Sequence, residues 1–312
     1  MKKIAGLDVG SNSVKLLVVE ECITGGGPGN VFEKSIICRL SEGLAHSGLL
    51  SIEAMNRTVE AVSLLLSGAG MKNGASVKAV VTAPGRRAYN GSQFVELLYE
   101  KTGVEASIIS VEEEASLSLL ATRCAFPESP ELLVVDLGGA STEFAYSVGE
   151  KSQVVSVPVG AVWLTEKFLT GDPPARKQIL EAKSSAATYY REAAKNLHIK
   201  EPENPALELV LVSGSARALW VVQRVLNGEK VSSPHGRSLS VEQVEMLSTR
   251  LQQMTVHEIS QLPHVNPARA DLLLGGSLLL GQILAQFAKG QMRVSAHGVS
   301  WGLVRREWDR VS

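Results

Sequence analysis

The chain has 312 residues, of which 45 % are hydrophobic, and a formal net charge of −1. This length suits two domains of about 150 residues each, and the hydrophobic content is typical of a globular chain. The near-zero charge excludes a general polyanion binder, so we expect no nucleic-acid partner, and any polyanion site must be a local patch.

Two features bear on the compartment. Asp8 interrupts the apolar segment that follows the first lysines, which predicts no signal peptide, and no apolar stretch is expected to be long enough to span a bilayer. The cysteines Cys22, Cys38 and Cys124 form no C-x-x-C pair, which predicts buried or free thiols in a reducing compartment. We therefore expect a cytoplasmic protein without a membrane partner.

The first predicted element is an apolar strand, residues 4–9, which runs into a turn and leaves it as a second apolar strand. The glycine of the turn permits a tight backbone, and its neighbours offer hydroxyl, amide and N–H donors to an anion. The turn consists of four small residues: Gly10, Ser11, Asn12 and Ser13. Asp8 ends the strand where an anion would sit, which requires a cation between them. The alternative is an ordinary hairpin turn with an incidental Asp.

The next elements lead to a pair of arginines. Residues 31–39 predict a third strand, and Ser51 is the expected N-cap of a helix whose apolar residues recur at helical spacing. A strand over residues 77–81 then opens into a loop that contains Arg86 and Arg87. A guanidinium binds phosphate in a fork, so Arg86 in particular is a candidate phosphate ligand. The alternative is a solvated loop.

Three successive carboxylates begin the following helix, after a strand over residues 106–109. Ser110 and Glu113 fit a capping box, and the helix dipole favours acidic residues in a first turn. These effects account for Glu112 and Glu113 without any chemistry, and they could account for Glu114. The charge load is nevertheless unusual, and it suggests that one carboxylate points into a cleft.

A proline-rich, polar segment at residues 126–131 is the predicted domain boundary. It gives a first domain over residues 1–126 and a second over 127–312, with the last helix free to pack back on the first. The second half is expected to contain strands over 132–137, 153–157, 207–212 and 293–295. Helices are expected over 162–169, 175–197, 216–226 and 267–289. Two further helices are expected, one of about fifteen residues that Ser240 caps and one at the C-terminus.

The second half also repeats the first turn. An apolar strand ends in Asp136, a turn of small residues follows, and a second strand begins with Glu143 near its start. This turn consists of Gly138, Gly139, Ala140, Ser141 and Thr142. At each Asp the competing explanation is a carboxylate that only stabilises its turn. Two copies favour phosphate and metal binding over that explanation, and they suggest two similar half-domains that face one cleft.

These motifs resemble the exopolyphosphatase/guanosine pentaphosphate phosphohydrolase family of the actin, sugar kinase and Hsp70 superfamily, over nearly the whole chain. Residues 8–13 and 136–143 are similar to its two phosphate motifs, and residues 82–91 to its arginine loop, with Arg86 at the arginine position. The segment Glu113-Glu114-Ala115 looks like the one that carries the catalytic glutamate of the family, which places that role on Glu114.

The resemblance implies an α/β fold of two RNase H-like domains flanking a central cleft. It implies Mg²⁺-dependent hydrolysis of the terminal bond of inorganic polyphosphate, with pppGpp as a further candidate substrate, and it suggests a homodimer. We assign Mg²⁺ to Asp8 and Asp136, the water-activating base to Glu114, and an assisting role to Glu143. Arg86 would clamp a phosphate, while the two turns, residues 10–13 and 138–142, would hold the terminal phosphoryl oxygens.

Three positions depart from the family pattern. Ala140 replaces a glycine, Ser213-Gly214-Ser215 stands where Gly-Gly-Thr is usual, and Ser300-Trp301 replaces an Arg-Glu pair. The last two put substrate contacts in doubt. The departures at Ala140 and Ser300-Trp301 motivate an alternative function, a polyphosphate- or (p)ppGpp-binding regulator with little turnover. A phosphotransferase of the same superfamily is a further alternative.

Overall fold

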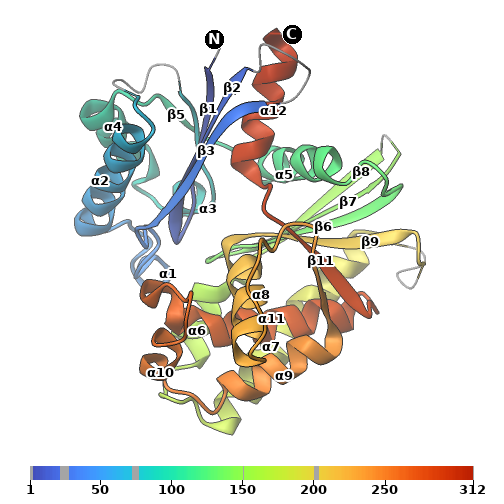
Figure 1. The fold of residues 1–312 in the computed structure, drawn as a ribbon. Coiled ribbons are helices and arrows are strands. Elements are labelled where there is room, and N and C mark those ends of the chain that lie inside the picture. Colours follow the sequence, from blue (N-terminus) through green and yellow to red (C-terminus); the bar gives the residue numbers. More distant parts are fainter. Residues whose placement is uncertain (1–2, 22–27, 72–76, 150, 200–203, 312) are drawn as a thin grey trace. The chain divides into compact units, whose positions relative to one another are not determined.

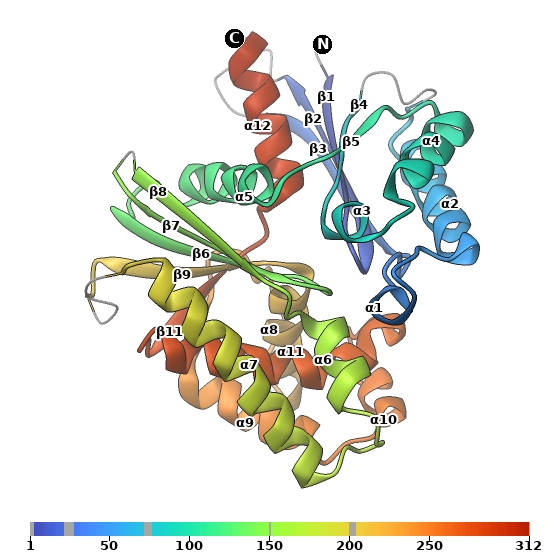
Figure 2. The ribbon, with the colours of Figure 1, turned by 180° about the vertical axis from the view of Figure 1, so that it is seen from behind.

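The computed structural model describes residues 3–21, 28–71, 77–149, 151–199 and 204–311. The chain divides into two compact units (Figures 1 and 2). Unit 1 comprises Met1–Ala121 and Gly298–Ser312, and unit 2 comprises Thr122–His297. Of the predicted thiols, Cys38 is buried and Cys124 exposed, both without a disulfide, while Cys22 lies outside the described residues.

Unit 1 is built on a five-stranded sheet with the order β3-β2-β1-β4-β5. The first three strands pair antiparallel, and β1, β4 and β5 pair in parallel. The strands are β1 (Lys3–Val9), β2 (Ser13–Glu21), β3 (Pro28–Ile37), β4 (Val77–Val81) and β5 (Ala106–Ile108). The helices are α1 (Leu44–Ser47), α2 (Ile52–Gly68), α3 (Ala83–Arg87), α4 (Gly91–Thr102), α5 (Val111–Ala125), which begins in this unit, and α12 (Val299–Val311).

Helices cover both faces of this sheet (Figure 1). On one face α2 and α4 enclose a core that includes Leu7 and Val62. On the other face α12 packs against β1 and β2, and Leu117 of α5 meets Leu303 of α12. Gly302 lets these two helices approach closely, because a Cβ at this position would lie 2.2 Å from the Leu117 carbonyl oxygen.

Unit 2 is built on a six-stranded sheet with the order β10-β11-β9-β6-β7-β8. Its strands are β6 (Glu131–Leu137), β7 (Thr142–Val148), β8 (Lys151–Val157), β9 (Leu207–Val212), β10 (Ser238–Ser240) and β11 (Gln291–Ser295). Its helices are α6 (Ala161–Phe168), α7 (Arg176–Asn196), α8 (Gly214–Leu226), α9 (Val241–Leu251), α10 (Val256–Ser260), the short 3₁₀ helix η2 (Pro267–Arg269) and α11 (Ala270–Gln286). The core gathers around α11, which packs against α6, α7, α8 and α9.

The two sheets share one topology. Read from β8, the second sheet runs β8-β7-β6-β9-β11, with the same antiparallel and parallel pairings as β3-β2-β1-β4-β5 in the first. The sheet of unit 2 adds only β10 at the far edge, antiparallel to β11. The α/β fold with two RNase H-like units, predicted from the sequence, is thereby confirmed.

Most of the predicted strands and helices are present in the structure, whereas α1, α4, α10 and β10 were not predicted. The strands at 77–81 and 207–212 have the predicted bounds, and Ser51 caps α2 by accepting from the Ala54 N–H at 3.1 Å. The expected loop at 82–91 contains a short helix instead, α3, because Pro84 lies in its first turn, where proline is favoured. The helix after Ser240 ends at Leu251, and the long helix expected over 267–289 is η2 followed by α11.

One expectation about apolar stretches was wrong. Residues Pro267–Gln286 form a helical segment long and apolar enough, by length and composition, to cross a membrane. However, 67 % of its most apolar window is buried inside the protein. A central core helix passes the same test, and the contacts of α11 with five other α-helices of unit 2 account for its composition.

Candidate functional site

The first predicted turn connects β1 to β2 and is closed by one hydrogen bond, from the Gly10 N–H to the Ser13 carbonyl at 3.1 Å. The segment after β3 holds the turn from outside. The N–H groups of Cys38 and Arg39 both donate to the Asn12 carbonyl at 3.0 Å. Ser41 donates its N–H to the Ser11 carbonyl, also at 3.0 Å. With three of its carbonyls engaged, the turn has a fixed shape.

Two buried side chains at this turn lack partners within the described residues. Both polar atoms of the Asn12 amide and the hydroxyl of Ser41 make no hydrogen bond there, although these residues are only 9 % and 5 % exposed. A buried polar group without a partner costs about 1–3 kcal/mol. Such a cost is recovered when a polar ligand binds, so the turn has the donors and acceptors that a phosphoryl group and its water would use.

Asp8, the predicted metal ligand of unit 1, is buried and faces Lys15 across the β1–β2 pair. The Lys15 ammonium lies 3.4 Å from the Asp8 carboxylate. Lys15 was not predicted as part of the site, although Asp8 and Lys15 are equally far from the centre of the hairpin and must therefore be opposite one another. The lysine reduces the negative charge at this strand end.

Glu114 and Arg86, predicted as base and phosphate clamp, meet in unit 1. An Arg86 nitrogen lies 2.7 Å from the Glu114 carboxylate and 3.0 Å from the Ile109 carbonyl. Burial raises the pKa of Glu114, the neighbouring Arg86 opposes that rise, and the charge of Asp8 adds to it. Glu114 is thus a carboxyl group whose proton affinity is enhanced, 7 % exposed, and held in one orientation by α3.

The other two carboxylates of this helix start have structural partners. The Ser110 hydroxyl accepts from the Glu113 N–H at 3.1 Å, as expected of an N-cap. The Glu113 carboxylate does not complete the box, because it pairs with Arg306 of α12 at 2.8 Å. Glu112 is exposed, and hydrogen bonds from its own backbone and from Ser110 lower its pKa. Only Glu114 of the three is buried.

The second predicted turn connects β6 to β7 with the same closure, from the Gly138 N–H to the Ser141 carbonyl at 3.0 Å. Its carbonyls are drawn toward the start of α6: Ala161 donates to Gly138, and two further N–H groups of α6 donate to Gly139, at 2.9–3.1 Å. Gly160 permits this approach, because a Cβ there would lie 2.4 Å from the Gly139 oxygen. A turn whose carbonyls point one way presents its N–H groups to the other side, as an anion site requires.

Asp136 and Glu143 are direct partners in the register of β6 and β7. Glu143 is 3 % exposed, and Ser156 donates to one of its oxygens at 3.0 Å. Like charges directly opposite one another on adjacent strands are destabilising, and a divalent cation with oxygen ligands relieves that repulsion. The donor set therefore fits Mg²⁺, although the described residues contain no group of three or more potential protein ligands.

The remaining predicted phosphate contacts of unit 2 differ in exposure. Ser141 and Ala140 are buried at 7 % and 6 %, whereas Gly138 and Gly139 are partly exposed. Thr142 is fully buried and its hydroxyl donates to the Val159 carbonyl at 2.5 Å. The hydrogen of this hydroxyl is therefore used within the protein and is not available to a phosphate.

The positions that depart from the family pattern have defined surroundings. Ser213 caps α8 through the Ala216 N–H at 3.0 Å. Trp301 lies near Glu33 of β3, with its indole nitrogen 3.4 Å from the carboxylate. The backbone of Ser300 packs against Gly6 of β1. Ser300 and Trp301 thus join α12 to the unit 1 sheet.

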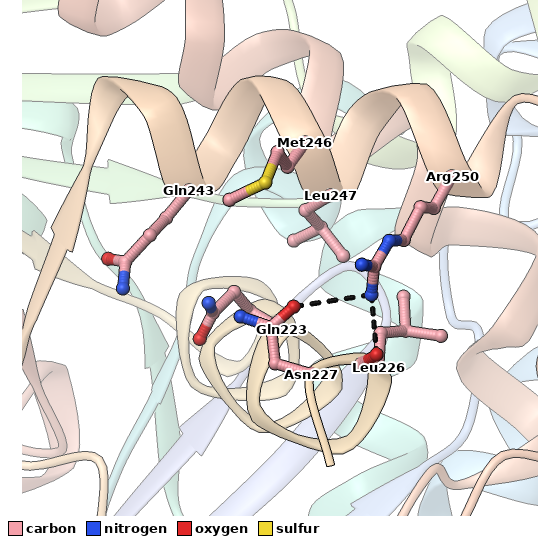
Figure 3. A pocket seen from close by; sticks show the side chains of 7 residues that line it. All are labelled: Gln223, Leu226, Asn227, Gln243, Met246, Leu247 and Arg250. Carbon is pink, nitrogen blue, oxygen red and sulfur yellow. Dashed lines mark hydrogen bonds between the residues drawn. The ribbon is translucent and has the colours of Figure 1, made fainter. Parts of the chain in front are cut away.

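Two hollows in unit 2 are lined by residues outside the turn of that unit. One, between α8 and α9, is crossed by hydrogen bonds from Arg250 to the end of α8 and has no room for water (Figure 3). The other has a volume of about 210 Å³ and is bounded by the α6–α7 connection, α10 and the start of α11. Neither contains a predicted site residue.

A family model described as the Ppx/GppA phosphatase family matches residues 18–310. The chain belongs to this family. It is 26 % identical over 310 residues to "Exopolyphosphatase 1" of Mycobacterium leprae (strain TN), covering 98 % of this chain and 90 % of that protein.

Solved structures agree with this assignment. A crystal structure of an exopolyphosphatase-like protein superposes with a TM-score of 0.87 at 26 % identity, covering 99 % of this chain and 98 % of that one. The Aquifex aeolicus member of the Ppx/GppA family gives a TM-score of 0.76 at 25 % identity, with 99 % of each chain covered. The family resemblance drawn from the two turns and the Glu-Glu-Ala segment is therefore confirmed.

Proposed function

We propose that this protein is a Mg²⁺-dependent exopolyphosphatase, which hydrolyses the terminal phosphoanhydride bond of inorganic polyphosphate and releases orthophosphate. Membership of a phosphatase family and the name of its curated relatives support this proposal. The observation that carries it is Glu114, a buried carboxyl group with a raised pKa, paired with Arg86. Asp8 of the first turn is near enough to influence that pKa.

Hydrolysis of this bond depends mainly on positioning and on neutralising charge. The turns at residues 10–13 and 138–142 are proposed to hold phosphoryl oxygens through N–H groups and, at the first turn, through the unpartnered Asn12 amide. Asp8 and Asp136 are the proposed Mg²⁺ ligands, with Glu143 as the second carboxylate beside Asp136. When bound, Mg²⁺ would supply positive charge against the phosphate oxygens.

Glu114 is the proposed general base. Water attacks the terminal phosphorus, a carboxylate oxygen of Glu114 takes its proton, and the bridging P–O bond breaks toward the shortened chain. A base works best when its pKa lies near the working pH, so the raised pKa of Glu114 suits this task. Arg86 holds Glu114 in the present structure and is proposed to clamp a phosphate once substrate enters.

We further propose pppGpp as a second substrate, since it ends in the same phosphoanhydride bond. A different candidate function is that of a regulator, which would bind polyphosphate or (p)ppGpp with little turnover. Two departures from the family pattern favour it: the buried Ala140 in the second turn, and Ser300-Trp301 where α12 contacts the sheet. A phosphotransferase would move phosphate to an acceptor other than water.

One experiment separates these functions. Orthophosphate release with Mg²⁺ is measured side by side on short polyphosphate, long polyphosphate, pppGpp and ATP, for the wild type, Glu114→Gln and Glu112→Gln. Loss of a general base costs roughly 10²–10⁴-fold, so Glu114→Gln should nearly abolish release, while Glu112→Gln, at an exposed neighbour, should retain it. Full activity of Glu114→Gln would discard the assignment, and tight binding without release by the wild type would support the regulator.

A further inference from the structure

Two hydroxyl groups, of Tyr190 and Thr142, form a series of hydrogen bonds beside the second turn. Tyr190 of α7 is fully buried, and its hydroxyl lies 3.1 Å from the Thr142 hydroxyl. The Thr142 hydroxyl in turn donates to the Val159 carbonyl at 2.5 Å. Three segments distant in sequence, α7, β7 and the link from β8 to α6, thus meet at one threonine.

The direction of this chain follows from the protons available. A threonine hydroxyl has a single hydrogen, which Thr142 uses on Val159, so Tyr190 must be the donor to Thr142. Burial raises the pKa of Tyr190; the hydrogen bond with Thr142 opposes that rise, and the negative charge of Glu143 adds to it by a smaller amount. The phenol therefore keeps its proton at neutral pH and acts as the donor to Thr142.

The chain ends on the residue that sets where α6 begins. Val159 directly precedes Gly160, whose backbone touches Gly139, and the first N–H groups of α6 hold the carbonyls of Gly138 and Gly139. Fixing the Val159 carbonyl therefore fixes the start of α6 against the turn. This contact determines how the N–H groups of the turn are presented.

We propose that Tyr190 is a positioning residue for the turn at residues 138–142, acting through Thr142 and Val159. The proposal rests on the phosphate-binding role proposed above for this turn. Tyr190 is too deeply buried to touch substrate. The equivalent position of unit 1 has no hydroxyl group, because Val14 stands there in place of Thr142. The two positions correspond in the strand register: Val14 pairs with Val9, and Thr142 pairs with Leu137.

The kinetic test compares Tyr190→Phe, Thr142→Val and the double variant in orthophosphate release from polyphosphate with saturating Mg²⁺. Tyr190→Phe keeps the ring, which packs edge-on against Phe144, and removes only the donor. We expect each single variant to lower kcat about tenfold, equivalent to about 1.4 kcal/mol, the size of one buried hydrogen bond. The double variant should be no slower than either single one, because both break the same chain.

Two conservative variants serve as controls. Thr142→Ser keeps the hydroxyl and should recover most of the kcat that Thr142→Val loses. Tyr189→Phe removes a hydroxyl from the adjacent, partly buried ring that packs against Trp163, and it should leave kcat unchanged. A merely structural role of Tyr190 would lower the melting temperature without a selective loss of kcat measured well below it, and that result would overturn the proposal.

Amide hydrogen exchange of the peptide covering residues 138–142 gives a readout independent of activity. Exchange there should be several-fold faster in Tyr190→Phe and Thr142→Val than in Tyr189→Phe. Unchanged exchange in Tyr190→Phe, or additive kinetic losses in the double variant, would overturn the proposal. If the wild type released no orthophosphate, the proposed function would fail by itself, and the exchange data would still decide whether Tyr190 holds the turn.

Discussion

The turn of unit 1 and the turn of unit 2 are two versions of one structure with different electrostatics. Both connect the first two strands of equivalent sheets, and both are closed by the same hydrogen bond, from Gly10 to Ser13 and from Gly138 to Ser141. Both are supported by the segment that follows the third strand. The shared backbone shows that the Asp-x-Gly pattern specifies the turn itself.

The difference lies opposite the aspartate. In unit 1 Asp8 faces Lys15, and in unit 2 Asp136 faces Glu143. The Asp8 carboxylate lies 3.4 Å from the Lys15 ammonium, whereas the strand register places a second carboxylate opposite Asp136. The two turns share a backbone conformation but have residues of opposite charge facing the aspartate, and we propose that the carboxylate pair of unit 2 contributes more to binding an added cation.

The largest expected effect tests that difference. Glu143→Gln keeps the shape of the side chain and its contact with Ser156 but removes the charge opposite Asp136. We expect orthophosphate release to fall about 100-fold, within the range for loss of a catalytic carboxylate, and the Mg²⁺ concentration for half-maximal rate to rise. Titration of the rate with Mg²⁺ measures both.

The matched change in unit 1 is Lys15→Met. It leaves Asp8 without its neighbouring cation, which should lower the rate by less than tenfold, the scale of a partly exposed ion pair, and should not raise the Mg²⁺ requirement. Equal Mg²⁺ dependence in Glu143→Gln and the wild type would remove the distinction between the two turns.

The next effect concerns the support of the second turn. Gly160→Ala places a Cβ 2.4 Å from the Gly139 oxygen, which overpacks two backbone segments and should destabilise the protein by about 2 kcal/mol. Gly281→Ala is the control, since its Cβ would make only an ordinary contact with Val244 at 3.9 Å. Urea unfolding of both variants gives the comparison, and equal stabilities would show that α6 does not constrain the turn.

A smaller effect, on the pH dependence of the rate, should distinguish Arg86 from its exposed neighbour Arg87. Arg86 opposes the burial that raises the pKa of Glu114, so Arg86→Met should raise that pKa further. A general base works only when deprotonated, and activity increases with pH through its pKa. The acidic limb of the pH–rate profile should therefore move to higher pH in Arg86→Met and stay in place in Arg87→Met. If the acidic limb moved to lower pH in Arg86→Met, Arg86 would not lower the pKa of Glu114.

The smallest expected effect is on the pH dependence of stability, and it comes from His297 of unit 2. Burial, with the charges of His235 and Arg217, lowers the pKa of His297 to about 4, and its ring stacks on His235 at 4.4 Å. Between pH 6.5 and 4 the unfolded chain binds a proton that native His297 does not, so stability falls as the pH drops, by on the order of 1 kcal/mol. Urea unfolding at pH 7 and 4.5 should show a smaller difference in His297→Asn than in the wild type.

The sequence by itself determined the features that depend on neighbouring residues. The two turns, the strand at 77–81 and the Ser51 cap follow from glycine freedom, apolar periodicity and one side-chain hydrogen bond, each satisfied within a few residues. The short helix α3 was missed because its five residues offer too little periodicity, although Pro84 in its first turn was a usable sign.

Only the tertiary structure decided which side chains meet. Arg86 and Glu114 are 28 residues apart in the chain, Thr142 and Tyr190 are 48 apart, and Glu113 and Arg306 are 193 apart. No local pattern marks Tyr190 as a partner of Thr142, because its place depends on how α7 packs beneath the sheet. The conformation of a turn is a local property of the backbone, whereas the charge and hydrogen bonds around it come from elements that folding brings together.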